Sequence, residues 1–590
     1  MFFRQFISPM LLVGFLGVLP LLSQTVPTSD GICPVKSFGA KGDGSTLDTE
    51  AISKAVRTCA EAGGGTVVFS PGSYVTGTFE ILSNITLQLD AGAVIIGSPH
   101  ISDYGKIGDY GLAKVYGLNS SGEGDLVGIV VARNAHDIAI VGRGTIDGRG
   151  DDFMDLSSSH VGADFDAQYA RNPEAFRSGV SDLAYGPVSP KEHEAGRPGT
   201  MLIFLNCKNV LLRDVTLRAA PNWTLHLQNT EQATISGIHI DNDLLIPNND
   251  GIDCMHCRHV HISDSDIQAG DDDLAIFGSD NVNVANCSLV SRSAAIRLES
   301  TRHSTFDNLS INSNRGIGIF HRGDSGDSTE SVLFSNISMR TKLIPGHWWG
   351  KAEPIYIAVS PCQQDQCKGG VHDVTFSNIT AEAESGILIY GAERSPITGL
   401  TLDRIRLKII APDAAIARSM GGNFDLRWTA RNLQEAIFKH DIPGVYCRWV
   451  QDFHLHGLKL QWGENLPDYF SDGIRCEQFR DVNIDHFEGR QAQTRGGAAL
   501  SFSDGAGLSI TGSTAAPGTS AFLKLSHVTD RRAFVNYDLG AARQKIVPPS
   551  TTFRTSNLYS VPGNRLKESR AKSAPAEAGS QPLAGPAPHR

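Results

Sequence analysis

The segment Pro247–Gly278 reads PNNDGIDCMHCRHVHISDSDIQAGDDDLAIFG and combines short alternating strands with acidic turns. Asp250 lies in an Asn-Asn-Asp-Gly turn, and three aspartates follow one another at positions 271–273. Asp250 and Asp271 are 21 residues apart. If this interval is about one coil of a β-solenoid, carboxylates that are distant in the sequence become neighbours in space.

A repeat with a similar interval extends on both sides of this segment. A polar residue followed by an apolar or β-branched one opens short strands at Asn209, Gln232, His259, Asn281, His303 and Ser331, and related starts follow at Asp373, Asp452 and Asp481. The first six starts are 22 to 28 residues apart. Repeats of roughly 20 to 50 residues are typical of solenoids and propellers. Strands of four to six residues without a helical period favour an all-β parallel β-helix.

The N-terminal part has the features of a cap on such a coil. Residues 48–61 have helical spacing and an acidic start, and Gly-Gly-Gly ends them. Short strands are predicted at 66–69, 86–89 and 93–96, and again at 129–131 and 138–141. A helix at this end would cover the apolar cross-section of the first coil, which otherwise faces water.

Four regions are expected along the chain. Residues 1–24 have a positive start and a short apolar run, which predicts a secretory signal peptide, with an uncleaved anchor as the alternative. The β-helix that carries the candidate site is expected over 33–400, and its continuation with insertions over 401–545. A disordered tail, rich in Pro, Ala, Ser and Lys, is predicted at 560–590. The exported protein is expected to be secreted or periplasmic.

A long polar stretch interrupts the coil at residues 151–200, with a partly helical part at 165–176. Long excursions from a regular scaffold often carry function. We expect this one to lie over one side of the coil, where it is long enough to block one end of a groove.

The overall charge argues against two classes of partner. The chain has 590 residues and a net charge of -11, so it lacks a general basic surface for nucleic acid or anionic membranes. We expect no nucleic-acid partner, no membrane contact beyond the signal peptide, and a monomer.

Ten cysteines in an exported chain of this length do not make a disulfide-rich scaffold. Cys33 and Cys59 are one candidate disulfide pair, and Cys362 and Cys367, which bracket a polar loop, are another. The run Cys254–His261 resembles a metal-binding motif. Strand alternation would place Cys254 and His256 on one face and Cys257, His259 and His261 on the other, so the cysteines are expected to be buried rather than to bind zinc.

The acidic turns allow a hydrolytic site. On stacked coils, about 4.8 Å apart, Asp250 and the Asp271–Asp272 pair would have carboxyls ~4 to 9 Å apart. That range includes the ~6.5 to 9.5 Å of inverting glycoside hydrolases, in which water fits between base and sugar. Repulsion between the carboxylates would keep one protonated as a general acid. On spacing alone, a solvated acidic turn or a calcium site is equally compatible.

Several motifs resemble one family over roughly Val35–Tyr390. They are FGAKGDG, GGGTVVFSPGSY, GTIDGRG, APNWTLHL, NNDGID and GDDDLAI. The chain is similar to glycoside hydrolase family 28, the polygalacturonases and rhamnogalacturonan hydrolases, which form right-handed single-stranded parallel β-helices of the pectin-lyase type. The resemblance implies a secreted enzyme that hydrolyses a pectic polysaccharide or its oligosaccharides with inversion.

The resemblance also implies roles for individual residues. The family's Asn-x-Asp motif falls on Asn248-Asn249-Asp250, which adds Asn248 as a substrate-binding candidate, and its Asp-Asp pair falls on Asp271-Asp272. Asp271 would be the general acid. Asp250 and Asp272 would hold and deprotonate the attacking water. No metal or other cofactor is implied.

Two family motifs are missing. The Gly-His-Gly segment aligns with Ser293–Ala295, so Ala294 replaces the histidine, and the Arg-Ile-Lys segment aligns with Gly318–Phe320. Losing both cations removes the partners that a uronic acid needs at that subsite, which predicts a neutral sugar on the leaving-group side. Four nearby residues are candidate replacements, although Arg297 and His321 also fit ordinary coil positions: Arg292, Arg297, His321 and Arg322.

The segment Gly346–Glu353 contains two adjacent tryptophans. Trp348 and Trp349 are candidates for a platform on which a sugar ring stacks, with Lys351 reaching a carboxylate. The alternative is a loop that packs its tryptophans against the coil.

Two further functional readings stay open. A pectate-lyase-type eliminase would need calcium ligands and an Arg or Lys base, whereas the motif here has three acids. A non-catalytic carbohydrate-binding solenoid would fit the missing histidine. Among hydrolases, the length of residues 151–200 favours exo action.

Overall fold

The computed structural model describes residues 31–110, 126–155, 174, 189–190, 196–322, 326–345, 348–362, 367–426, 437–493, 496–535 and 537–547. The predicted signal peptide, the predicted tail and the predicted helix at 165–176, apart from Glu174, lie outside these residues.

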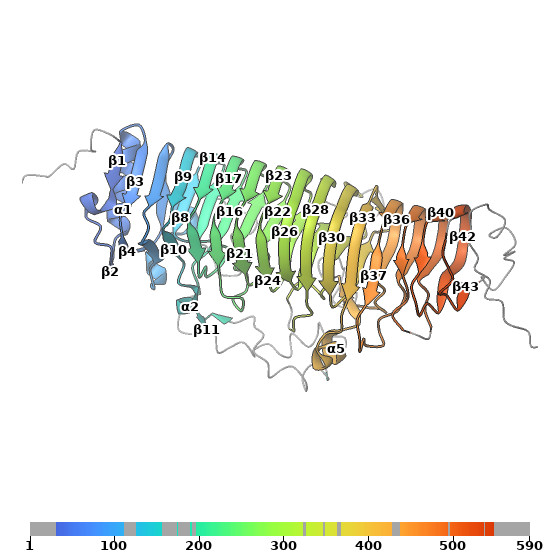
Figure 1. Ribbon diagram of the computed structural model, residues 1–590. Coiled ribbons are helices and arrows are strands. Elements are labelled where there is room, and N and C mark those ends of the chain that lie inside the picture. The colour runs from blue at the N-terminus through green and yellow to red at the C-terminus, as the bar shows by residue number, and fades with distance from the viewer. Residues whose placement is uncertain are drawn as a thin grey trace, which may run out of the picture.

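All but four of the described strands form one long parallel coil (Figure 1). One 39-stranded sheet runs from β1 (Ile32–Pro34) to β43 (Gln544–Val547), and its strands pair in parallel with those of the next coil. The all-β, right-handed parallel β-helix that the sequence predicts is confirmed. The same sheet passes through residue 400 without a break, so the division between a site-bearing part and a continuation stays a prediction.

The residues that mark the sequence repeat have a common backbone conformation. Each has a positive φ, between 46° and 62°, and together they are Asn209, Gln232, His259, Asn281, His303, Ser331, Asp373, Asp452 and Asp481. A left-handed residue bends the chain sharply, here within a strand, and Asn, Asp and His tolerate this conformation better than most residues. The repeat therefore records the position of a bend in each coil.

The core consists of apolar side chains stacked along the coil axis. One such row passes through β19 (Ile252–Met255), β22 (Leu274–Phe277), β25 (Ala294–Glu299), β27 (Arg315–His321) and β29 (Ile355–Val359). Its members are buried and in register: Ile252, Leu274, Ile296, Ile317 and Ile355. Each buried aliphatic side chain contributes about 1.5–3 kcal/mol. Since side chains alternate along a strand, the residues between them point out of the coil.

A helix closes the N-terminal end, as predicted. α1 (Thr49–Glu61) begins after Asp48 and buries one apolar face against the first coils. Cys59 from this face forms a disulfide with Cys33. Cys362 and Cys367 form the second disulfide, so both predicted pairs are confirmed.

The predicted alternation around Cys254 is wrong in one respect. Cys254 and Cys257 are both buried, whereas His256, His259 and His261 are exposed. His256 and His259 have positive φ values of 53° and 56°, so each interrupts the strand alternation at a bend. The thiols thus face the core and the imidazoles face solvent.

Two small antiparallel pairs lie outside the main sheet. They are β11 (Met154–Asp155) with β12 (Ser189–Pro190), and β34 (Asn423–Asp425) with β35 (Ile437–Lys439). α5 (Ala414–Met420) leads into β34, and Figure 1 shows α5 emerging from the same lower edge of the coil as α2 (Gly150–Phe153).

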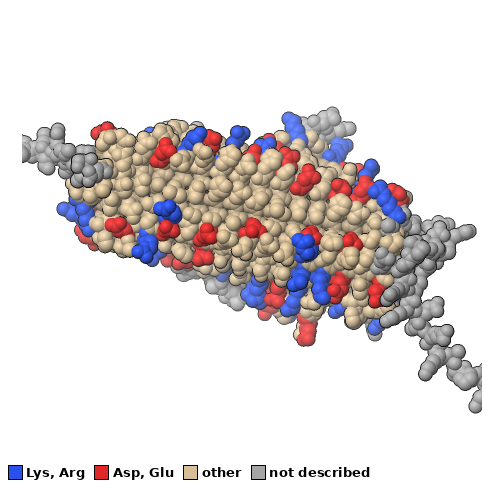
Figure 2. Space-filling view, turned by 45° about the horizontal axis from the view of Figure 1, so that its top comes forward, with Lys and Arg blue, Asp and Glu red and all other residues tan. Residues whose placement is uncertain are grey.

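The surface in Figure 2 carries acidic and basic residues interspersed along the whole coil, without a continuous basic stripe on that face. No helix among the described residues has both the length and the apolarity to cross a membrane.

Candidate active site

Two turns at the same edge of the coil carry the candidate catalytic acids. The first connects β18 (His239–Asp241) to β19 and holds Asp250, and the second connects β21 (Asp266–Ala269) to β22 and holds Asp271 and Asp272. Ile252 is in register with Leu274, and the Gly251 N–H donates to the Asp272 carbonyl. Asp272 therefore stacks directly on Asp250, and Asp271 precedes it by one residue.

Asn249 joins the two turns. Its amide nitrogen donates to the Asp243 carbonyl (2.7 Å), and its amide oxygen accepts from the Gly270 N–H (2.6 Å). Asn242 supports this arrangement by donating to the Asn249 carbonyl (3.0 Å). The spacing of Asp250 and Asp271 did not predict these hydrogen bonds. The sequence Asn-Asn-Asp could have drawn attention to Asn249, because it directly precedes Asp250.

Asn248 contributes mainly through its backbone. Its φ is 56°, and its N–H donates to Asp271. Its side-chain oxygen accepts from Arg197, at 3.3 Å, and Arg197 also donates to the carbonyl of Pro247. The sequence interpretation missed Arg197, because it lies 51 residues upstream of Asn248.

The three acids converge in a buried position. Asp250, Asp271 and Asp272 are 5%, 7% and 0% exposed, and each offers a carboxylate oxygen within 4.8 Å of the others. Burial and the charge of Asp272 raise the pKa of Asp271 to about 6. Burial and the charges of Asp253, Asp271 and Asp272 raise the pKa of Asp250 well above its usual value.

Hydrogen-bond donors already face two of these carboxylates. Asp272 accepts from the Ala294 N–H (3.2 Å) and from Arg297 (3.1 Å), and Asp271 accepts from Ser293 and Asn248. Three carboxylates could bind a hard cation such as Ca²⁺. A guanidinium next to one of them repels such a cation, so the donor set fits protonation chemistry better than a metal site.

Asp253 adds a further acid that the sequence interpretation missed. It lies on the outward face of β19, is fully buried, and has no hydrogen-bond partner for either carboxylate oxygen in the described part of the chain. Burial and the charge of Asp272 raise its pKa well above the usual range. Next to it in register lies His226, whose pKa burial lowers to about 4. Strand alternation could have indicated that Asp253 points out of the core.

Arg297 lies where the missing cations would be expected. It is in register with Gly318 on the next coil, and its guanidinium lies 5.0, 5.5 and 5.9 Å from the rings of Phe277, Phe320 and Trp349. A side chain at Gly318 would meet the Phe320 ring and Arg315. A longer side chain at Gly318 would therefore have to displace the Phe320 ring or Arg315, whereas Arg297 brings its charge from the preceding coil.

His321 and Arg322 do not lie with the carboxylates, contrary to expectation. They are at the far end of β27, six residues beyond Arg315, which corresponds to about 20 Å along the strand. His321 is buried and bonds the Lys368 carbonyl (3.0 Å), and Arg322 is 3.5 Å from Glu299. Strand alternation could not show which end of β27 adjoins the acidic turns. The fourth candidate, Arg292, is partly buried near the charge of Asp243.

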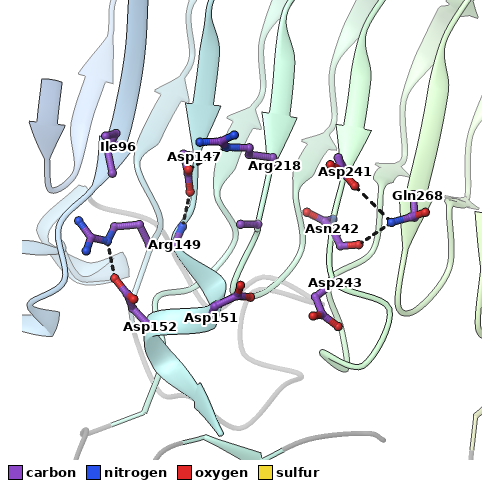
Figure 3. Close-up of a pocket in the computed structure, with 11 residues that line it drawn as sticks. Ile96, Asp147, Arg149, Asp151, Asp152, Arg218, Asp241, Asn242, Asp243 and Gln268 are labelled. Atoms are coloured by element: carbon purple, nitrogen blue, oxygen red, sulfur yellow. Dashed lines mark hydrogen bonds and ion pairs between the residues drawn. The ribbon is translucent and has the colours of Figure 1, made fainter. Parts of the chain in front are cut away.

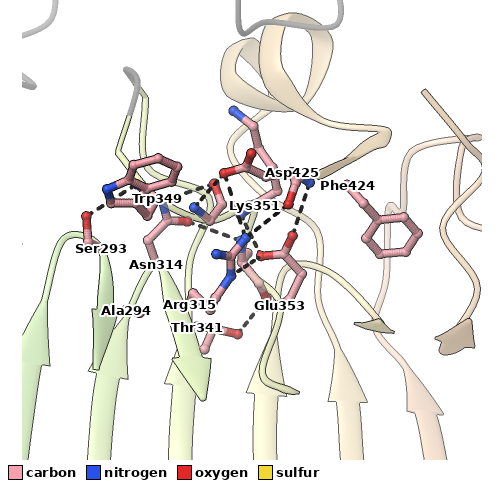
Figure 4. A network of polar contacts seen from close by, with 12 residues as sticks. Ser293, Ala294, Asn314, Arg315, Thr341, Trp349, Lys351, Glu353, Phe424 and Asp425 are labelled. Atoms are coloured by element: carbon pink, nitrogen blue, oxygen red, sulfur yellow. Dashed lines mark hydrogen bonds and ion pairs between the residues drawn. The ribbon is translucent and has the colours of Figure 1, made fainter. Parts of the chain in front are cut away.

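The two tryptophans differ in environment. Trp348 is buried (3% exposed), as a packing residue would be, whereas Trp349 is only partly buried and its N–H donates to the Ser293 hydroxyl (3.3 Å). Figure 4 shows Trp349 beside Ser293 and Ala294, with Lys351 in the same segment. Lys351 is 3% exposed. Trp349 is therefore the better candidate for a sugar platform.

An acidic pocket of about 610 Å³ lies beside the turn that carries Asp250 (Figure 3). Asn242 and Asp243 belong to both the pocket and the turn. Five carboxylates and two guanidinium groups line the pocket, from Asp147, Asp151, Asp152, Asp241, Asp243, Arg149 and Arg218. This excess of negative charge disfavours a uronate in the pocket.

Comparison with known families gives two matches. The model described as "Glycosyl hydrolases family 28" matches residues 188–419, which include every candidate catalytic acid. The model described as "Rhamnogalacturonase A/epimerase, pectate lyase-like" matches residues 32–115.

Individual relatives agree with these matches. A "Probable polygalacturonase" of Vitis vinifera is 26% identical over 405 residues, covering 63% of this chain and 74% of the relative. An "Exo-poly-alpha-D-galacturonosidase" of Dickeya chrysanthemi is 26% identical over 274 residues, 43% of each chain. The family 28 exopolygalacturonase structure of Yersinia enterocolitica superposes with a TM-score of 0.52 at 16% identity, over 77% of this chain and 79% of that one, so the two share a fold.

Proposed function

Because the chain belongs to glycosyl hydrolases family 28 and is a polygalacturonase-like glycoside hydrolase, we propose that it hydrolyses glycosidic bonds of a pectic polysaccharide by single displacement with inversion. Asp271 donates its proton to the leaving glycosidic oxygen as the C–O bond breaks. Asp250 and Asp272 hold a water molecule, which loses a proton to one of them as its oxygen bonds the anomeric carbon. The sugar leaves with the configuration of that carbon inverted.

The convergence of three buried carboxylates, two of them with raised pKa values, carries this proposal. A general acid works best when its pKa lies near the working pH, and the pKa of Asp271, about 6, suits that role. The three carboxyl groups interact, so they titrate as a coupled set with apparent pKa values that belong to the group. The enzyme should therefore have a bell-shaped pH–rate profile.

The distance between the acids does not assign the stereochemistry. Oxygens within 4.8 Å of one another are closer than the ~6.5–9.5 Å typical of inverting enzymes and nearer the ~5–5.5 Å of retaining ones. Inversion is proposed on the family resemblance. The test is proton NMR of the first-formed product: the anomer opposite to that of the substrate supports inversion, and the same anomer contradicts it.

The proposed substrate has a neutral sugar on the leaving-group side, as in rhamnogalacturonan-type chains. Gly318 and Phe320 replace two cations, and Arg297 already pairs with Asp272. The acidic pocket also disfavours uronates on that side of the turn. The test compares kcat/KM on homogalacturonan, rhamnogalacturonan and neutral-branched oligosaccharides. A clear preference for unsubstituted polygalacturonate over every rhamnogalacturonan fragment would reject this substrate.

The same panel tests the remaining alternatives. An eliminase would form an unsaturated, ultraviolet-absorbing product and lose activity in EDTA, whereas the proposed hydrolase does neither. Exo action would release only terminal units, and this expectation rests on residues 151–200, most of which lie outside the described residues.

We also propose that the protein is exported. The apolar segment before residue 24 and two disulfides support this, since structural disulfides persist in oxidising compartments. Cell fractionation with N-terminal sequencing tests it. Recovery of the full-length chain in the cytoplasm would contradict export.

A further inference from the structure

The backbone of the segment Trp349–Ala352 is held by side chains rather than by a strand partner. Four successive N–H groups in it each donate to a side-chain oxygen. The acceptors, in order, are Ser293 Oγ (3.3 Å), Asp425 Oδ2 (3.1 Å), Glu353 Oε2 (2.7 Å) and Asn314 Oδ1 (3.1 Å). Three of these residues are distant in sequence from the segment, so its position depends on three different parts of the chain.

A buried ion network fixes two of the acceptors (Figure 4). Arg315, at 1% exposure, is 3.4 Å from Glu353 and 3.7 Å from Asp425, and its guanidinium lies 3.7 Å from the Tyr356 ring centroid. Asp425 belongs to β34, outside the main sheet. Charges that are buried and mutually paired hold a defined geometry, because separating them leaves an uncompensated charge. The network therefore ties β34 to the segment beside the acids.

The other end of the segment reaches the candidate general acid through one hydroxyl. Ser293 Oγ accepts the Trp349 N–H, and the same hydroxyl bonds the Asp271 carboxylate, which lowers the pKa of Asp271 against the effects of burial and Asp272. The Trp349 N–H leaves the Ser293 proton free to donate to Asp271. A shift of the segment would thus change the hydrogen bond on Asp271.

We propose that Ser293 and Asp425 are positioning residues. Together with the network around Arg315, they hold Trp349 beside Arg297 and set the pH at which Asp271 gives up its proton. This inference rests on the proposed role of Asp271 as the general acid. It assigns a part in the reaction to β34, whose Asp425 lies 154 residues after Asp271 in the sequence.

The first test is the pH dependence of kcat/KM in Ser293→Ala. Without the hydroxyl, the pKa of Asp271 rises, so the alkaline limb of the profile moves up by roughly one pH unit. Ser293→Thr keeps a hydroxyl and should restore most of the original limb. Ser304→Ala is the matched control, because Ser304 is also a buried serine that bonds backbone groups, in β26 (Arg302–Ser313) and away from the acids. It should leave the limb unchanged.

The second test is Asp425→Asn, which keeps an acceptor for the Gly350 N–H but removes the charge that faces Arg315. We expect KM to rise several-fold as Trp349 is displaced, and the alkaline limb to move in the same direction as in Ser293→Ala. A purely structural role would lower the melting temperature without moving either quantity, and that result would overturn the proposal.

Asp271→Asn separates this inference from the proposed function. If Asp271→Asn keeps wild-type activity, the role of Asp271 is wrong and the inference falls with it. If Asp271→Asn is inactive while Ser293→Ala and Asp425→Asn keep the wild-type limb and KM, only the positioning proposal is wrong.

Discussion

Two groups of buried charges occupy the same position on successive coils and are built in opposite ways. The register places Asp250, Asp272, Ala294, Arg315 and Glu353 in one column. At one end two carboxylates face each other, and at the other end an arginine faces a glutamate. The first pair repels and raises pKa values, whereas the second neutralises itself. The backbone position is the same at both ends. Only the side chains decide whether it carries acids with raised pKa values or an ion pair that holds its surroundings in place.

The difference implies a division of labour. Like charges in a buried site lower the stability of the fold. Such an arrangement is typical of a site whose chemistry needs a protonated acid. The paired charges next to them hold the surrounding segment in place. The predictions below test each end of the column.

Asp271→Asn should have the largest effect. Removing the general acid should lower kcat by about 10² to 10⁴, because proton donation to the leaving oxygen is lost. The measurement is the initial rate of product formation on the best substrate of the panel. Asp266→Asn is the matched control, since it changes an exposed aspartate on β21. Comparable losses in both variants would contradict a special role for Asp271.

Arg315→Met should strongly destabilise the other end of the column. It leaves Glu353 and Asp425 buried without their cation, at a cost of about 3–5 kcal/mol in the free energy of unfolding. Denaturant unfolding at neutral pH measures this. The double variant Arg315→Met with Glu353→Leu should recover part of the loss, and no loss in the single variant would show that the network is not a stabilising pair.

Asp271→Asn should at the same time stabilise the fold at neutral pH. The pKa of Asp271 is about 6 in the folded protein, against a usual aspartate value of 3.8. Below about pH 3 the carboxyl is protonated in both states, so it costs nothing. As the pH rises to about 6, the unfolded state ionises first, and the wild type loses ~1–3 kcal/mol that the amide does not lose. The difference between the melting temperatures of the two proteins should therefore be larger at pH 7 than at about pH 3, and a constant difference would contradict the raised pKa.

Asp253→Asn should have the smallest effect. After burial, the charge of Asp253 is the next cause that raises the pKa of Asp250. Without it, Asp250 ionises at lower pH and can serve as a base there, so the acidic limb of kcat/KM should move down by less than about one pH unit. A limb that moves up would show that Asp253 acts on the reaction in another way.

Local sequence was sufficient for much of this molecule. The left-handed bends at Asn209 and its equivalents produce a visible repeat, and the helical spacing of residues 48–61 predicts α1. The one-coil interval correctly placed Asp250 near Asp271 and Asp272. These features could be predicted because each depends on a period or a turn within a few residues.

Contacts between coils could not be predicted in the same way. The sequence interpretation left open whether Asp271 or Asp272 stacks on Asp250. It also proposed His321 and Arg322, together with Arg297, as replacements for the missing cations. The register favours Asp272, and the direction of β27 puts His321 at the far end. Shifting a strand by one residue reverses every side chain, and the pattern of apolar residues alone does not reveal which end of a strand adjoins a given turn.

The sequence by itself thus determined the coil, its cap, its disulfides and the kind of chemistry that its acidic turns allow. Only the tertiary structure decided that Arg297 from one coil and Ser293 from its turn contact those acids, and that Asp425 from β34 holds the segment beside them. The physical reason is that a side chain's protonation and position depend on burial and on neighbours within a few ångströms, and folding brings those neighbours from positions that are, for example, 25 or 75 residues away in the sequence.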